Sequence, residues 1–238
     1  MNLYDLIIPE KEAVQLPDVF LKDADRQRIL QLIKEHSYIA RLQEYGLPVN
    51  NKVLLHGQSG CGKTTTAKAI AAALGKNIIT VNLSNVICSR IGETAQNIKM
   101  LFDKAARERA VLFLDEFDHL AKERSGDDKD VGEMRRLVNT LIQLVDHYPE
   151  HALLLCATNH LSLIDTALLR RFQVRINYET PTPELLNAYY DKLLARFPQP
   201  MQQLNRMYNV SFAEARDYAF THVKSLLLAE WEEKAKLQ

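Results

Sequence analysis

Short runs that are apolar at every position alternate with stretches of helical periodicity through most of the chain. Fully apolar runs are typical of strands buried on both faces of a sheet. The alternation therefore predicts an α/β fold, in which a parallel five-stranded sheet is sandwiched between helices. The expected strands cover residues 52–56, 77–82, 110–115, 152–157 and 173–178. The expected helices cover residues 24–45, an Ala-rich stretch between Thr64 and Gly75, and residues 93–109 and 133–146, with a charged loop at residues 123–130.

The pattern changes at Pro181 and Pro183, beyond which only helical stretches follow. The last long helix is expected to open with a capping box of Ser211 and Glu214. The apolar residues near its end, Leu226, Leu227, Leu228 and Trp231, are expected to belong to the core of this part. We therefore expect an N-terminal segment (residues 1–20), an α/β domain (21–180) and a small all-α domain (181–238) with helices at 184–197, about 200–208 and 211–236.

Composition and charge narrow the class of protein. The 238 residues are 47% hydrophobic, which excludes disorder as the main state. Equal numbers of basic and acidic residues, 30 of each, argue against an obligate nucleic-acid binder. The chain has no run of 18 apolar residues, and its first residues lack the features of a signal peptide. Three widely spaced cysteines fit reduced thiols rather than a metal cluster. Together with the absence of a long apolar run, they predict a cytoplasmic protein with no membrane segment.

A glycine-rich segment joins the first expected strand to the Ala-rich helix. Residues 57–64 read GQSGCGKT and fit the P-loop pattern G-x-x-x-x-G-K-[ST]. Backbone N–H groups of such a loop cradle phosphates, Lys63 would neutralise the β- and γ-phosphate oxygens, and the Thr64 hydroxyl would coordinate Mg²⁺. The alternative is a strand-to-helix turn without a ligand. The residues expected to bind ATP or ADP are Gly57, Gln58, Ser59, Gly60, Cys61, Gly62, Lys63, Thr64 and Thr65.

Two acidic residues follow the strand expected at residues 110–115. Ligands bind at the carboxyl ends of the strands in open α/β sheets, so these acids are placed to act on a bound nucleotide. Asp115 is expected to hold Mg²⁺, and Glu116 to polarise the attacking water. The alternative is a pair of acids in a solvated loop.

Polar groups also stand next to the last two expected strands. Asn159 follows the strand at 152–157 and could orient the attacking water, although an Asn that starts a turn is the simpler interpretation. Arg170 and Arg171 precede the fifth strand. Arginine is suited to stabilise transition-state charge from a second subunit, and the alternative is a solvated surface pair.

Taken in order, GQSGCGKT, FLDE (113–116), ATN (157–159) and LIDTALLRRF (163–172) resemble the AAA clade of the AAA+ ATPases, and compact bacterial AAA proteins most of all. The resemblance covers roughly residues 20 to 236. It implies a P-loop NTPase sheet of the ASCE type with strand order 5-1-4-3-2, followed by a helical lid domain. It also implies a homo-oligomeric ring, commonly a hexamer, with ATP at the subunit interfaces. Asn159 matches sensor 1, and Arg170 and Arg171 match the arginine fingers.

Two departures from the family pattern affect the expected function. The two arginines are adjacent rather than separated as in R-P-G-R-F-D, and Gln173 stands where Asp is usual. Arg90, Ile91 and Gly92 occupy the place of the first pore loop, where protein-threading rings usually have an aromatic residue before the apolar-Gly pair. Arg216 lies near the place of a sensor-2 arginine, although a solvated helix residue is the simpler interpretation there.

These features favour an ATP-hydrolysing ring that remodels a protein partner. The alternative is a nucleotide-dependent scaffold or loader with little turnover, acting on protein or, less favoured by the neutral charge, on nucleic acid. A small-molecule P-loop kinase is a third option. With about 20 residues before the resemblance, substrate recruitment is expected in residues 1–21, in residues 122–132, or in a separate adaptor such as a protease.

Overall fold

The computed structural model of the chain describes residues 6–9, 14–84, 91–119 and 128–236, with the backbone alone for residues 91–93 and 128–134. The chain divides into two compact units. The first comprises Met1–Gly57 and Lys63–Asn177. The second comprises Gln58–Gly62 and Tyr178–Gln238.

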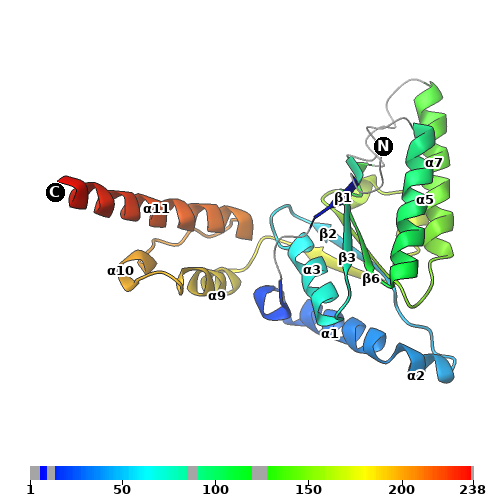
Figure 1. The fold of residues 1–238 in the computed structure, drawn as a ribbon, viewed down its shortest axis with the longest axis horizontal. Helices are drawn as coiled ribbons and strands as arrows, with labels where there is room; N and C mark the ends of the chain where they lie inside the picture. Colours follow the sequence, from blue (N-terminus) through cyan, green and yellow to red (C-terminus); the bar gives the residue numbers. More distant parts are fainter. Residues whose placement is uncertain (1–5, 10–13, 85–90, 120–127, 237–238) are drawn as a thin grey trace. The chain divides into compact units, whose positions relative to one another are not determined.

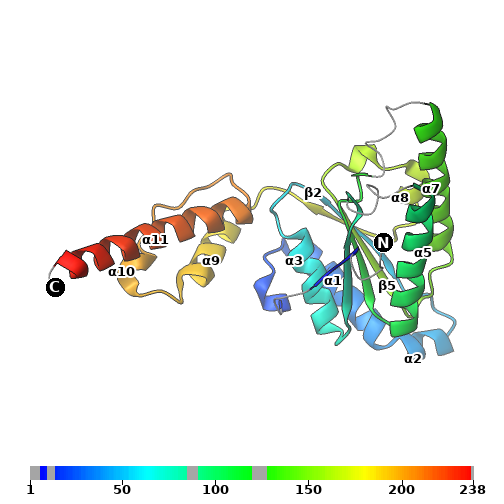
Figure 2. The same ribbon diagram turned by 45° about the horizontal axis from the view of Figure 1, so that its top comes forward.

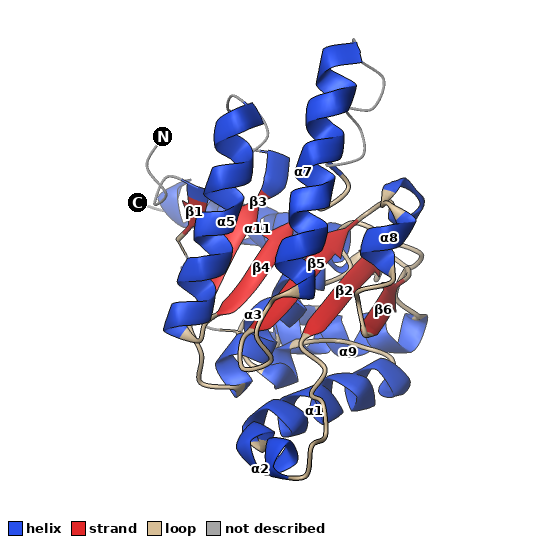
Figure 3. Cartoon of the chain, turned by 90° about the vertical axis from the view of Figure 1, so that its right-hand side faces the viewer, coloured by secondary structure: helices blue, strands red, loops and turns tan. Residues whose placement is uncertain are grey.

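A six-stranded sheet forms the centre of the first unit, in the order β1-β3-β4-β5-β2-β6 (Figure 3). Neighbours among β2 to β5 pair in parallel, as the apolar runs predicted. Their order also confirms the 5-1-4-3-2 arrangement implied by the family resemblance. The strands are β1 (Ile7–Ile8), β2 (Lys52–Gly57), β3 (Ile78–Asn82), β4 (Val111–Asp115), β5 (Leu153–Thr158) and β6 (Val174–Tyr178).

The sixth strand corrects the prediction of five. Ile7 and Ile8 pair antiparallel with Val81 and Thr80 at the edge of the sheet. Two residues are too few to show an alternation of apolar and polar positions, so no pattern in the sequence indicates this strand.

Helices cover both faces of the sheet (Figures 1 and 3). On one face, side chains such as Leu112 and Leu154 join a buried cluster with Ile98 and Leu141 of two long helices. Residues that alternate with them, such as Phe113, point to the opposite face and are equally buried. The helices of this unit are α1 (Asp23–Ser37), α2 (Ile39–Glu44), α3 (Lys63–Ala73), α5 (Ile91–Glu108), α7 (Asp128–Asp146) and the short α8 (Thr166–Leu169), with 3₁₀ turns at Leu16–Asp18 and Leu161–Leu163.

Two helix boundaries differ from the prediction. The helix expected over residues 24–45 is broken at Tyr38 into α1 and α2. Helix α7 begins at Asp128, so residues 128–130 of the expected charged loop are helical, while residues 123–127 lie outside the described part of the chain. Charged residues are compatible with a loop or with an exposed helical turn, so composition alone could not decide between them.

The second unit packs three helices around one small core. Helices α9 (Pro183–Leu194) and α10 (Gln199–Gln202) lie beside α11 (Phe212–Lys236) in both ribbon views (Figures 1 and 2). Ser211 and Glu214 form the predicted capping box, with Glu214 N donating to Ser211 Oγ and Ser211 N donating to the Glu214 carboxylate. The buried residues of this small core are Leu186, Tyr190, Leu194, Met201, Ala215, Ala219 and Val223.

Two predictions for this unit were wrong. The helix expected at about 200–208 ends at Gln202; residues 203–208 have no regular secondary structure, and residues 209–210 form a bend. Leu226, Leu228 and Trp231 are exposed at the end of α11, and of the four residues expected in the core only Leu227 packs against it.

None of the helices that the structure describes combines the length and the apolarity needed to cross a bilayer.

Candidate active site

The predicted polar residues gather where the parallel strands end. Strand β2 ends at Gly57 and leads into the glycine-rich loop, and α3 begins at Lys63. Strand β4 ends at Asp115, which lies opposite Asn82 of β3 in the register. The carboxyl ends of parallel strands form the edge at which open α/β sheets bind their ligands.

The glycine-rich loop has the backbone geometry of an anion nest. Gly57, Gly60 and Gly62 have φ angles of 118°, 72° and 101°, which residues with a side chain rarely adopt. A Cβ atom at Gly60 would lie 2.8 Å from Ser211 Oγ, and the Gly60 carbonyl accepts a hydrogen bond from Ala213 N at 3.2 Å. Cys61 is buried, and its thiol donates to Ser59 O at 3.6 Å. Both the backbone angle and the close neighbours therefore require glycine at position 60.

Three predicted residues of the first unit lie together at this edge. Lys63 is only 8% exposed, and its Nζ donates to Gly57 O at 2.7 Å. The Thr64 hydroxyl donates to Asp115 Oδ2 at 3.0 Å, although the two residues are 51 positions apart. A hydroxyl and a carboxylate in contact are the oxygen ligands that Mg²⁺ accepts beside a nucleotide, so this pair fits the ion.

Asp115 is a carboxylate in a partly dry environment. Burial raises its pKa above the ordinary value, and this effect outweighs the hydrogen bonds from Glu116 N and Thr64, which lower it. The buried negative charge lacks the solvation that water would supply. A bound cation would provide that compensation.

Glu116 and Asn159 directly follow β4 and β5, which are neighbours in the sheet. Glu116 is half-buried and has a φ angle of 55°, a strained value of the kind found at functional sites. The next residue, Phe117, donates its backbone N–H to Ala157 O at 2.8 Å and so joins the end of β4 to β5. Asn159 is exposed directly after β5, where its amide is accessible to a ligand.

The two predicted arginines lie elsewhere. Both arginines follow α8. Two residues after Arg171, Gln173 donates its backbone N–H to Lys52 O at the start of β2. The phosphate loop follows the opposite end of β2. The length of β2, about 16 Å, separates these two levels of the sheet. No hydrogen bond or ion pair within the described part of the chain joins either arginine to Lys63, Thr64 or Asp115.

The structure also distinguishes one arginine from the other. Arg171 donates Nε and Nη2 to the two carboxylate oxygens of Asp146 at 2.9 and 3.1 Å, and Nη1 to Ala167 O at 2.6 Å. Arg170 is exposed, and its side chain forms no such bond to the described residues. The partner Asp146 was missed in the sequence because a single acid on the polar face of an amphipathic helix carries no pattern.

Comparison with known proteins places the chain in a family. The family model named ATPase family associated with various cellular activities (AAA) matches residues 53–180. The chain belongs to the AAA family of ATPases. Nucleotide binding and ATP hydrolysis are the activities that this family name describes. The matched range contains the glycine-rich loop, Asp115, Glu116 and Asn159.

Three relatives of this AAA protein are each 33% identical to it over part of its length. An uncharacterized AAA family ATPase, y4kL of Sinorhizobium fredii, aligns with 89% of this chain and 64% of its own length. The peroxisomal ATPase PEX1 of Komagataella phaffii aligns over 68% of this chain and 14% of its own. The proteasome-activating nucleotidase of Aeropyrum pernix aligns over 76% and 47%. The chain thus spans less than two thirds of each of these relatives.

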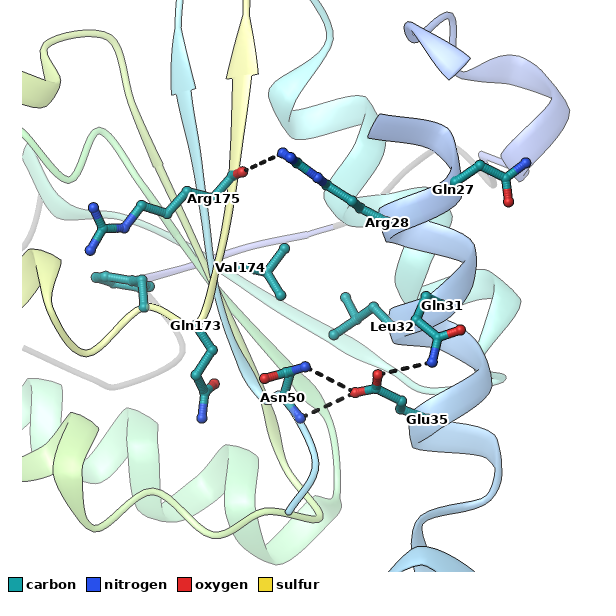
Figure 4. A pocket seen from close by; sticks show the side chains of 10 residues that line it. Gln27, Arg28, Gln31, Leu32, Glu35, Asn50, Gln173, Val174 and Arg175 are labelled. Atoms are coloured by element: carbon teal, nitrogen blue, oxygen red, sulfur yellow. Dashed lines mark hydrogen bonds between the residues drawn. The ribbon is translucent and has the colours of Figure 1, made fainter. Parts of the chain in front are cut away.

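A separate cavity of about 860 Å³ lies between α1 and the start of β6 (Figure 4). None of the predicted site residues lines it. Its polar side chains largely bind one another or the backbone: Glu35 accepts from Asn50 and Gln31, and Gln173 Oε1 accepts from Asn51 N and Lys52 N at 3.1 and 2.9 Å. Gln173, the departure from the usual Asp, therefore anchors the start of β2.

Two further predictions concern residues away from this edge. Arg90 of the expected pore loop lies outside the described residues, and the backbone of Ile91 and Gly92 forms the first turn of α5. Arg216 is exposed on α11 with its Nε 3.4 Å from Asp217 Oδ1, as expected for a solvated helix residue.

Proposed function

We propose that this AAA protein hydrolyses ATP in a ring of identical copies and uses the hydrolysis to remodel a protein partner. The observation that carries the proposal is the direct contact between Thr64 and Asp115 beside the glycine-rich loop. This contact brings the glycine-rich segment and the acidic end of β4 together, as an ATP hydrolase with a P-loop requires.

Each residue at the edge then has a role that suits its position. The loop N–H groups hold the phosphates, and Lys63 exchanges Gly57 O for phosphate oxygens. Mg²⁺ held by Thr64 and Asp115 would neutralise charge on the β- and γ-phosphates. Glu116 accepts a proton from the attacking water, which Asn159 helps to orient. Residues 21–180 serve as the nucleotide-binding domain and 181–238 as its lid.

The position of the arginines supports the proposed assembly. In-line hydrolysis gains from a cation at the γ-phosphate, and Arg170 lies away from the phosphate loop of its own chain. Arg170 of one copy therefore completes the site of the next copy. We assign this role to Arg170 rather than Arg171, because Arg171 already uses its guanidinium within the chain.

A protein partner is favoured over nucleic acid. The net charge of zero provides no excess of cations for a phosphate backbone. One relative carries the name proteasome-activating nucleotidase, which describes an action on a protein assembly. A cytoplasmic location is part of the same proposal.

The test measures ATP binding and turnover as the protein concentration rises. Wild-type turnover per chain should increase with concentration and then level off, and unfolded polypeptide should stimulate it more than DNA does. Lys63→Ala should weaken ATP binding by about 100-fold, because a charged hydrogen-bond donor is lost. Lys68→Ala, on the same helix, is the control and should bind normally. A full hydrolysis rate in dilute monomer would refute the shared site, and stimulation by DNA alone would favour the loader.

A further inference from the structure

We propose that Asp146 is a positioning residue, which holds Arg170 in place for the neighbouring copy by clamping Arg171. The proposal rests on the proposed function, in which Arg170 completes a site in trans. It assigns a role to a residue of α7 that has no contact with the phosphate loop among the described residues.

The clamp is a two-point contact. Arg171 donates Nε and Nη2 to the two oxygens of Asp146 at 2.9 and 3.1 Å, a fork geometry that fixes direction as well as distance. Its third nitrogen, Nη1, donates to Ala167 O at 2.6 Å. One guanidinium thus joins the end of α7 to the turn of α8 that carries Arg170.

Helix α8 depends on such contacts. It has four residues, Thr166–Leu169, and a helix of one turn has no stability of its own. Asp165 caps it by accepting from Ala167 N at 2.7 Å, and Arg175 Nη2 donates to Leu169 O. Helix α8 is therefore held by Asp165 at its start, and by Arg171 and Arg175 at the carbonyls of Ala167 and Leu169.

The residues on either side of Arg170 are anchored while Arg170 itself is exposed. The side chains of Leu168 and Phe172 are 1% and 3% exposed, and the Phe172 ring packs edge-to-face on Phe117 with centroids 5.9 Å apart. Both rings belong to the buried core of the first unit, so this contact anchors Phe172. An exposed arginine between fixed neighbours is suited to reach another molecule without being reoriented.

The rigid partner in the clamp is α7. Asp146 is its last residue and directly follows Val145, which is fully buried in the core. The Asp146 and Arg171 side chains are 41% and 30% exposed, and exposed ion pairs contribute little to global stability. Loss of the clamp should therefore affect the placement of Arg170 more than the folding of the chain.

The experiment compares steady-state ATP turnover at protein concentrations on the plateau. Asp146→Asn and Arg171→Ala should each lower kcat about tenfold with KM for ATP nearly unchanged, since misplacement by an ångström can cost that much or more. The double variant should be no slower than Arg171→Ala, because both changes remove one interaction. Asp146→Glu should recover part of the rate. Glu108→Gln removes an exposed ion pair with Lys104 on α5 and should keep the wild-type rate.

Mixed assemblies separate positioning from a fault in the variant's own site. Asp146→Asn chains mixed with Glu116→Gln chains should regain turnover, because the nucleotide of the first then meets an intact Arg170 of the second. The inference would be overturned if Asp146→Asn kept the wild-type kcat while Arg170→Ala, measured separately, was inactive. The proposed function would then still stand. Arg171→Ala as inactive as Arg170→Ala, or no recovery on mixing, would also overturn it. Wild-type turnover of Arg170→Ala would instead refute the proposed finger.

Discussion

The phosphate-loop end of the sheet and the arginine segment before β6 differ in what their polar groups bind. At the first, Lys63, Thr64 and Asp115 are at least partly buried and bind within the edge itself. At the second, Arg170 is exposed between residues that are anchored. This difference suits the proposed function, in which the first end encloses a nucleotide and the second presents Arg170 to another copy.

The two carboxylates at these ends show the same contrast. Burial raises the pKa of Asp115, so its charged form is disfavoured in the free protein. The Arg171 guanidinium lowers the pKa of Asp146, so its charged form is favoured. The negative charge of Asp115 therefore lowers the stability of the free protein, and a bound cation would offset this cost. The negative charge of Asp146 is already paired with the Arg171 guanidinium.

The largest expected effect comes from disabling one end at a time. Glu116→Gln and Arg170→Ala should each lower ATP turnover about 1000-fold while ATP binding persists, because each acts on the transition state. An equal mixture of the two chains should recover about a quarter of the wild-type turnover, the share of interfaces that pair an intact carboxylate with an intact arginine. Recovery of nothing would show that both groups act within one chain and would remove the distinction between the ends.

An intermediate effect is expected from crowding in the phosphate loop. Gly60 and Gly46 have similar φ angles, 72° and 67°, but only a Cβ at Gly60 meets other atoms within 4 Å. Gly46→Ala should lower the thermal midpoint by a few degrees through backbone strain alone. Gly60→Ala should lower it by clearly more, and should also weaken ATP binding. Equal midpoints for the two variants would show that the contacts with Ser211 and Ala213 do not hold the loop.

The smallest expected effects are the opposite stability changes of the two carboxylates. In the absence of nucleotide at pH 7, Asp115→Asn should raise the thermal midpoint by a few degrees, since it removes a desolvated charge. Asp146→Asn should lower it by about a degree or two, since it removes an exposed ion pair. A lowered midpoint for Asp115→Asn would contradict the role of burial at that end.

The Asp146 effect also has a defined pH dependence. Its pKa is lower in the folded than in the unfolded chain, so its stabilisation is fully present above the ordinary carboxyl pKa of about 4 and is lost as the pH falls through the lowered value. The midpoint difference between wild type and Asp146→Asn should therefore shrink below about pH 4. Thermal unfolding followed by circular dichroism at several pH values measures it.

Much of the molecule can be predicted from local sequence alone. The strand of residues 153–158 is apolar along its whole length and is buried at every position, so period and burial agree. The glycine-rich loop is equally legible, because the angles at Gly57, Gly60 and Gly62 are open to glycine and costly for other residues. The capping box of Ser211 and Glu214 spans only three positions. In each case the physical cause lies within a few residues of its effect.

The features that depend on distant partners are seen only in the folded structure. It added β1, whose two residues pair with β3, and it broke the first long helix at Tyr38. It also distinguished two adjacent arginines that look equivalent in the sequence, because Asp146, 25 residues away, binds one of them. Such pairings follow from where the backbone brings side chains together, and no periodicity of the chain records them. The buried parallel strands and the phosphate loop therefore follow from local sequence, whereas the exposure of Arg170 and the pairing of Arg171 depend on the tertiary fold.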